Sequence, residues 1–163
     1  MRLLKLTAYL SLWAFFFGLV VLVHLWITVL GLPNRWQIIS RLNRNFTLLM
    51  RVILNIKVTV EGDAGPLERG GYVIIANHVS YVDGIVLGSI FPILFVSKRE
   101  IKGWPVVGQW NTLCGTIFIN RQRKERVGSL VEEMLGKLKQ EANLLLFPEG
   151  TSTDGERMLP FQT

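Results

Sequence analysis

The chain has 163 residues and a formal net charge of +6, and hydrophobic residues make up 50% of it. This length allows one domain of about 100–150 residues plus a short attachment. The charge is unevenly placed: residues 1–60 contain seven Lys or Arg and no Asp or Glu, whereas residues 61–163 contain eleven against twelve. A basic segment joined to an apolar one favours membrane lipids as partners, and without a basic stripe interleaved with aromatics we expect no nucleic acid.

Cysteine and histidine are scarce. Cys114 is the only cysteine, so an internal disulfide is excluded, which fits a reducing cytosol. The two histidines, His24 and His78, lie far apart in the sequence. We therefore expect no metal site.

An uncharged apolar run extends from Leu6 to Leu32. About 20 residues suffice to cross a bilayer core, so the run predicts a transmembrane helix, or one that re-enters a single leaflet. A cleaved signal peptide is the rival interpretation, but its apolar region spans about 7–15 residues and ends in an A-x-A-like site. Neither feature is present here, and we expect a retained membrane helix that ends at Pro33.

The next segment, Asn34–Ile56, has the pattern of a basic amphipathic helix. Apolar residues recur at spacings of three or four, and Arg41, Arg44 and Arg51 lie off their stripe. Such a helix either rests in the lipid headgroup layer or packs on the catalytic domain, and the pattern leaves both open. Four arginines follow the apolar run against two basic residues before it, which favours a globular part on the cytoplasmic face of the inner membrane. We interpret residues 1–56 as membrane-anchoring helices.

From Lys57 onward, short β-rich runs alternate with helical stretches. The candidate strands are Lys57–Glu61, Tyr72–Ala76, Ile93–Ser97, Thr116–Asn120 and Leu144–Phe147. The candidate helices are Tyr81–Ile90, a stretch near Pro105–Leu113, and Lys124–Ala142. The last has an apolar stripe made of Val127, Leu130, Val131, Met134, Leu135 and Leu138.

This alternation predicts an α/β domain over residues 57–163, with a largely parallel sheet flanked by helices. The N-terminal membrane-associated helical pair precedes it. Residues 148–163 look like a loop that leads into further structure. We therefore expect the domain to be truncated at its C-terminus.

Polar residues follow the candidate strand at Tyr72–Ala76, in the order Asn-His-Val-Ser-Tyr-Val-Asp from 77 to 83. The carboxyl end of a strand is the usual ligand position in an α/β fold. His78 can serve there as a general base, worth about 10²–10⁴ in rate, with Asp83 accepting its Nδ1 proton. The plainer alternative is a helix cap, because Ser80 and Asp83 have the S-x-x-D form of a capping box. A capping turn can also aim Asp83 toward His78, so the two roles are compatible.

Two further segments offer groups for a ligand. The loop Phe-Pro-Glu-Gly-Thr-Ser at 147–152 contains Glu149, Gly150 and Thr151. Its backbone N–H groups and hydroxyls suit an anion, and Glu149 can bind a polar headgroup. The segment 115–121 ends in Arg121, which can hold a phosphate through two hydrogen bonds. The plainer interpretations are a simple turn for the first segment and a solvated charged run for the second.

In this order, NHxxxxD, GxIFINR and FPEGT, the three segments resemble the glycerolipid acyltransferase superfamily, whose best-known members are 1-acylglycerol-3-phosphate (lysophosphatidic acid) acyltransferases. The resemblance covers roughly residues 72–163. It implies that His78 is the catalytic base and that Asp83 orients it. It also implies that Arg121, Glu149 and Gly150, with Thr151 in the same loop, serve the acceptor.

The resemblance further implies acyl-CoA or acyl carrier protein as the acyl donor and co-substrate, a lysolipid as the acceptor, and no cofactor. Two departures concern the acceptor. Many lysophosphatidate enzymes have Arg after EGT, whereas this chain has Ser152, and Asn120 replaces the common aspartate before Arg121. The loss of a cation leaves room for an acceptor other than a phosphate, such as a lyso-ornithine lipid.

We therefore predict an O-acyltransferase of membrane lipid biosynthesis. Its expected acceptor is 1-acylglycerol-3-phosphate, with lyso-ornithine lipid as the second candidate. Two alternatives stay open. One is a phospholipid–lysophospholipid transacylase that uses the same His–Asp pair, and the other is a catalytically inactive membrane-anchored adaptor.

Overall fold

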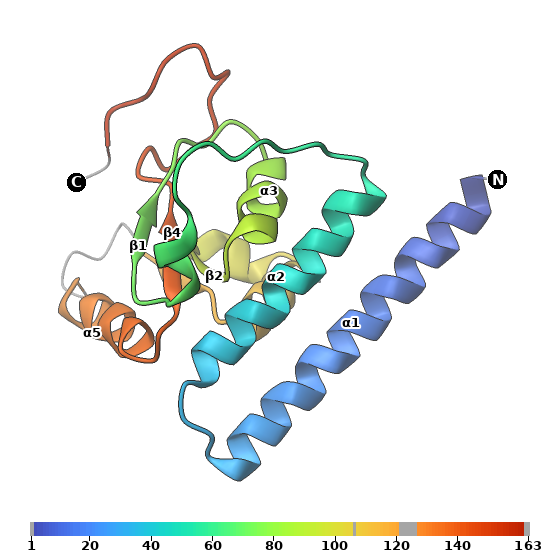
Figure 1. The fold of residues 1–163 in the computed structure, drawn as a ribbon, viewed down its shortest axis with the longest axis horizontal. Coiled ribbons are helices and arrows are strands. Elements are labelled where there is room, and N and C mark those ends of the chain that lie inside the picture. The colour runs from blue at the N-terminus through green and yellow to red at the C-terminus, as the bar shows by residue number, and fades with distance from the viewer. Residues whose placement is uncertain (1, 106, 121–126, 162–163) are drawn as a thin grey trace.

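A computed structural model describes residues 2–105, 107–120 and 127–161 of the chain. Two long helices come first, and a parallel sheet with flanking helices follows (Figure 1). The strands are β1 (Val73–Ile75), β2 (Ile93–Lys98), β3 (Ile117–Ile119) and β4 (Asn143–Leu146). The helices are α1 (Arg2–Leu30), α2 (Arg35–Ile53), α3 (Val82–Ile90), α4 (Val107–Leu113) and α5 (Val127–Leu138), with 3-10 turns η1 (Gly65–Glu68) and η2 (Arg99–Gly103).

The four strands form one sheet in the order β1-β4-β2-β3, and every pairing is parallel. The two central strands are the most apolar, because they are covered by helices on both faces. Ile93 and Leu94 of β2 and Leu144 and Leu145 of β4 are at most 1% exposed, and they form the core. The predicted α/β class with a parallel sheet is confirmed.

The helices cover the sheet unequally. In Figure 1, α2 and α3 lie side by side on one side of the sheet, and α5 lies apart from them. The approach of α2 to α3 is close, since a Cβ added at Gly88 would lie 3.1 Å from the Thr47 side chain. On α5, only half of the predicted apolar stripe is used. Leu130, Met134 and Leu138 pack on the core, whereas the other half of the stripe is exposed: Val127, Val131 and Leu135.

The two N-terminal helices are antiparallel neighbours (Figure 1). Val20 and Ile27 of α1 are buried, and the Phe16 ring lies 4.9 Å from the Phe46 ring of α2, measured between centroids. His24 of α1 hydrogen-bonds through Nε2 to the carbonyl of Leu113 at the end of α4.

A helix over most of Leu6–Leu32 is thus present, as predicted. Across the helices whose residues are described, none is both long enough and apolar enough to cross a bilayer. The expected transmembrane helix is therefore not confirmed.

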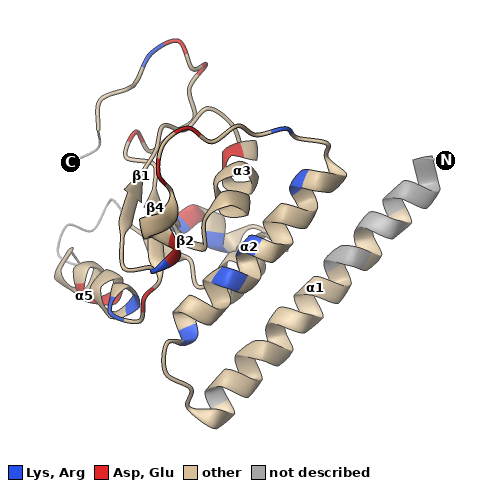
Figure 2. Ribbon diagram, in the orientation of Figure 1, with Lys and Arg blue, Asp and Glu red and all other residues tan. Residues whose placement is uncertain are grey.

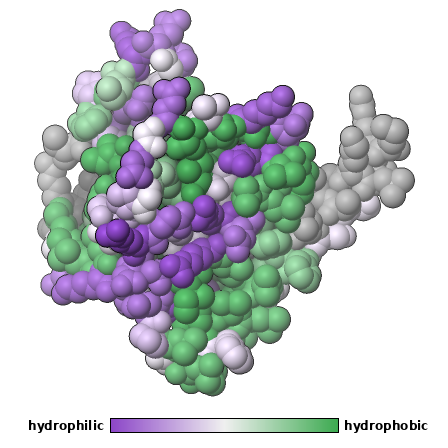
Figure 3. Space-filling view, viewed as in Figure 1, coloured by the Kyte–Doolittle hydropathy of each residue, from purple (hydrophilic) through white to green (hydrophobic). Residues whose placement is uncertain are grey.

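Helix α2 packs on the α/β domain, which was one of the two alternatives for Asn34–Ile56. Ile39, Phe46 and Met50 are buried between the helix and the domain. Basic residues recur along the helix (Figure 2), and two of them contact the domain: Arg44 pairs with Glu68, and Arg51 donates to the Ser89 hydroxyl. Figure 3 shows a hydrophilic band over α2 that borders the hydrophobic surface of α1.

The predicted strand at Lys57–Glu61 is wrong. The segment is irregular, and Thr59, Val60 and Glu61 are exposed. A strand requires a hydrogen-bonded neighbour, and the sheet edge at β1 pairs only with β4 among the described strands. These residues favour a strand, but without a neighbouring strand to pair with they do not form one.

Candidate active site

The loop between β1 and α3 places the first predicted segment at the carboxyl end of the sheet. Ser80 and Asp83 do cap the start of α3. The Ser80 Oγ accepts a hydrogen bond from the Val82 N–H at 3.2 Å, and Asp83 Oδ2 accepts one from the Ser80 N–H at 2.9 Å. Both side chains thus bond backbone N–H groups at the start of α3, as in a capping box, except that Val82 rather than Asp83 donates to the Ser80 hydroxyl, and these bonds fix the turn that carries His78.

The same turn brings His78 and Asp83 together. His78 Nδ1 lies 2.9 Å from Asp83 Oδ2, and the Val79 N–H donates to that same oxygen at 2.7 Å. Because a carboxylate oxygen can only accept, Nδ1 carries the proton in this pairing, and Nε2 is the basic nitrogen of the neutral ring. The cap and the His–Asp pair therefore coexist, with one oxygen serving both.

The electrostatics keep Asp83 ionised. Partial burial acts to raise the pKa of the carboxyl, but hydrogen bonds from Ser80, His78 and Val79 outweigh it and hold the pKa below the ordinary value of 3.8. An ionised Asp83 stabilises the imidazolium that forms when Nε2 takes a proton. With the proton on Nδ1 and a negative charge on Asp83, Nε2 of His78 can act as a general base.

Phe147, the residue that follows β4, packs flat on the imidazole of His78. The two ring centroids are 4.2 Å apart, and the planes meet at 20°. The hydrogen bond to Asp83 holds one edge of the imidazole, and the stack holds its face, so together they set the direction of Nε2. Sequence reasoning assigned no role to Phe147, and its one signal is its place between the last strand and the Pro-Glu-Gly turn.

The rest of the 147–152 loop forms a tight turn with a buried glutamate. Gly150 has a φ of +70°, which favours glycine, and its N–H closes a turn on the Phe147 carbonyl at 3.0 Å. Glu149 is 1% exposed, and its Oε2 accepts the Leu159 N–H at 3.4 Å. Among the described residues, its other oxygen, Oε1, has no hydrogen-bond partner. Thr151 is exposed.

The chain after this loop returns to the site, because the Thr153 N–H donates to the His78 carbonyl at 2.8 Å. The described part of the predicted segment at 115–121 lies away from this loop. Its strand, β3, is at the opposite edge of the sheet from β1. Arg121 itself lies outside the described residues. The acceptor-binding roles of Arg121, Glu149, Gly150 and Thr151 stay predictions.

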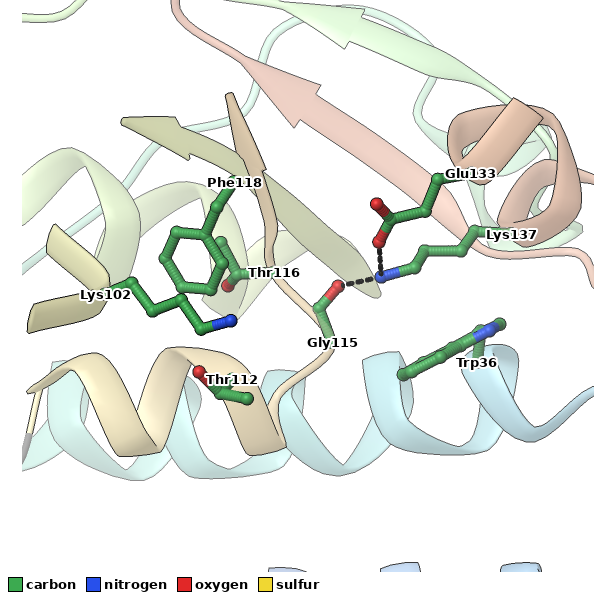
Figure 4. Close-up of a pocket in the computed structure, with 8 residues that line it drawn as sticks. All are labelled: Trp36, Lys102, Thr112, Gly115, Thr116, Phe118, Glu133 and Lys137. Atoms are coloured by element: carbon green, nitrogen blue, oxygen red, sulfur yellow. Dashed lines mark hydrogen bonds and ion pairs between the residues drawn. The ribbon is translucent and has the colours of Figure 1, made fainter. Parts of the chain in front are cut away.

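A cavity of about 300 Å³ lies beside β3, between α2, α4 and α5 (Figure 4). One of its lining residues is Lys137, whose ammonium group is buried. This group donates to the Gly115 carbonyl at 2.6 Å, lies 3.3 Å from a Glu133 oxygen and sits 4.2 Å from the centroid of the Trp36 ring. Burial lowers the pKa of Lys137, and the nearby Glu133 acts against that shift. These contacts connect α5 to α2 and to the segment before β3, so Lys137 has a structural role.

Within the described part of the chain, no group of three or more His, Cys, Asp or Glu side chains gathers as a metal site would require. The candidate site is a His–Asp pair at the strand ends of a parallel α/β domain, an arrangement that can remove a proton from a nucleophile. Comparison with known proteins narrows the class. The family model described as Acyltransferase matches residues 57–163, and the chain belongs to that family.

Several curated proteins are similar to the chain. A lyso-ornithine lipid O-acyltransferase of Rhizobium meliloti (strain 1021) is 34% identical over 131 residues, covering 80% of this chain and 42% of the relative. One of Pseudomonas aeruginosa is 37% identical over 123 residues, covering 75% of this chain and 46% of the relative. A 1-acyl-sn-glycerol-3-phosphate acyltransferase of Neisseria gonorrhoeae is 34% identical over 101 residues, covering 62% and 40%. The chain thus spans less than half the length of each of these relatives. No solved structure matches it significantly.

Proposed function

We propose that the chain is a lysolipid O-acyltransferase of membrane lipid biosynthesis. The observation that carries the proposal is the 2.9 Å contact between His78 Nδ1 and Asp83 Oδ2, in a chain of the acyltransferase family. The relatives are named for two acceptors, a lyso-ornithine lipid and 1-acyl-sn-glycerol-3-phosphate. Both acceptors are lysolipids with a free hydroxyl, and the proposal assigns acylation of such a hydroxyl to this chain.

In the proposed mechanism, Nε2 of His78 accepts the proton of the lysolipid hydroxyl while its oxygen attacks the carbonyl carbon of a thioester. The donor is acyl-CoA or acyl carrier protein. The tetrahedral intermediate collapses, the C–S bond breaks, and the imidazolium returns its proton to the leaving thiolate. Asp83 stays ionised throughout and stabilises the imidazolium. The products are an ester and a free thiol, so the step balances without a cofactor or a covalent enzyme intermediate.

The surface of the N-terminal helices supports the proposal that the reaction takes place at a membrane. Several large apolar side chains of α1 are exposed, among them Leu22, Leu25 and Trp26, and α1 lies beside α2, which carries basic residues along its length (Figure 2). An apolar surface next to a cationic one suits the boundary between acyl chains and anionic headgroups. We therefore propose that residues 1–56 hold the domain on the membrane, at the cytoplasmic face of the inner membrane, where lysolipid and product reside.

The test is acyl transfer by the whole chain in lipid vesicles, with radiolabelled acyl-CoA or acyl carrier protein and each of the two acceptors. The variant His78→Ala should lose about 10²–10⁴ in kcat while its vesicle binding is unchanged. His24→Ala, which removes the histidine outside the site, is the matched control and should keep most of the activity. Undiminished turnover by His78→Ala would remove the base from the proposal.

Two other outcomes would identify the alternatives. Transfer from intact phospholipid, without transfer from either thioester, would indicate a transacylase. Vesicle binding without any turnover would indicate an adaptor.

A further inference from the structure

The segment that returns to the active site borders a small, open hollow. It is attached at Thr153, whose N–H bonds to the His78 carbonyl at 2.8 Å, and at Leu159, whose N–H bonds to Glu149 at 3.4 Å. The hollow has a volume of about 140 Å³, and its lining residues are Thr153, Asp154, Arg157 and Leu159. This volume suits a lipid headgroup rather than an acyl chain. One of its lining residues, Thr153, is bonded to the backbone of His78, the proposed base.

Two opposite charges line this hollow. The Asp154 side chain is held in place, because its Oδ1 accepts the Glu156 N–H at 3.1 Å. Neither Asp154 nor Arg157 belongs to any of the ion pairs found among the described residues. A carboxylate and a guanidinium that share a hollow without pairing complement a ligand that has one ammonium and one carboxylate.

Resting on the proposed acyltransferase function, we propose that this hollow binds the zwitterionic headgroup of an amino-acid lysolipid. Arg157 pairs with the headgroup carboxylate through two hydrogen bonds, and Asp154 pairs with its ammonium. The same hollow disfavours a phosphate monoester, which carries about −1.5 to −2 charges at neutral pH and would meet the Asp154 carboxylate. Ser152, earlier in the loop, adds no cation for a phosphate. Asp154 thus excludes one acceptor while it attracts the other.

The first arm of the test measures headgroup binding without turnover. Nα-acetyl-L-ornithine, which has a free carboxylate and a free ammonium, and glycerol 3-phosphate are each titrated into the whole chain and followed by NMR. The wild type should bind the ornithine derivative more tightly. Asp154→Asn and Arg157→Gln should each weaken that binding by about tenfold to a hundredfold, the usual effect of losing a charged hydrogen bond.

Glu156→Gln removes the same charge two residues from Asp154, outside the lining of the hollow, and serves as the matched control. It should leave binding unchanged. Equal or tighter binding of glycerol 3-phosphate by the wild type would overturn the proposal. So would variants at 154 and 157 that bind like the wild type.

The second arm measures kcat/KM for lyso-ornithine lipid and for 1-acylglycerol-3-phosphate. Asp154→Asn should lower kcat/KM about tenfold or more for the first acceptor and leave it unchanged or raised for the second. An equal loss with both acceptors would overturn the assigned specificity. If the wild type acylates neither acceptor, the proposed function fails, and the binding arm still decides whether the hollow is a headgroup site.

Discussion

Replacing Asp83 with Asn separates the two roles that one carboxylate oxygen serves. Asp83 Oδ2 accepts from His78 Nδ1 at 2.9 Å, from the Val79 N–H at 2.7 Å and from the Ser80 N–H at 2.9 Å. Asn keeps the size of the side chain and one accepting oxygen. It removes the negative charge and exchanges the other oxygen for an N–H₂ donor. The backbone cap can therefore survive, whereas support for the imidazolium cannot.

The expected losses differ in size. The same substitution in a serine-protease triad lowers kcat about 10⁴-fold, because the imidazole takes the wrong tautomer and its cation is no longer stabilised. We expect Asp83→Asn to lower kcat by about 10³–10⁴. The free energy of unfolding should fall by only about 1–3 kcal/mol, since hydrogen bonds to a charged acceptor become hydrogen bonds to a neutral one.

The assay pairs steady-state acyl transfer with urea unfolding. Ser80→Ala is the control, because it removes the hydroxyl that caps Val82 and leaves His78 and Asp83 unchanged. It should cost about 0.5–2 kcal/mol of stability and little activity. The reasoning is refuted if Ser80→Ala loses as much activity as Asp83→Asn, or if Asp83→Asn stays within threefold of the wild type.

Three further outcomes are expected. The folded-state pKa of Asp83 lies below its ordinary value of 3.8, so the stability that it contributes is present above that pH and is lost as the pH falls through the folded pKa. The difference in urea unfolding between Asp83→Asn and the wild type should therefore be full at pH 7 and shrink as the pH falls below 3.8. Phe147→Leu should lower kcat by up to about tenfold with little change in KM, whereas Phe147→Tyr, which keeps the stacked ring, should retain most of the rate. Gly70→Ala should destabilise the fold by more than about 1 kcal/mol, because Gly70 has a φ of +82° and a Cβ there would overlap the Glu141 carbonyl. Gly136→Ala, at a position in α5 with open space around it, should not destabilise the fold. Thermal unfolding of the two variants checks this prediction.

Local pattern by itself determined most of the elements. Four of the five predicted strands are present, each within one residue of its expected ends, because all four are short runs rich in apolar residues. For the central strands β2 and β4, such a run follows from burial on both faces of the sheet. The failure at Lys57–Glu61 has the opposite cause, since its β propensity finds no neighbouring strand. The five-residue spacing from His78 to Asp83 allowed both their contact and a helix cap, because a helix-capping turn is a local structure, and the structure contains both. Their catalytic roles stay predictions.

Tertiary structure alone decided what surrounds that pair. The order β1-β4-β2-β3 makes the first and last strands neighbours, so the loop after β4 meets the loop after β1. That pairing stacks Phe147 on His78 and ties Thr153 to the His78 carbonyl, two contacts between residues far apart in the sequence. Strand order depends on how the whole core packs, and no short window of sequence contains that information. The hollow lined by Asp154 and Arg157 exists for the same reason, because the segment that forms it is held in place by residues of two different loops.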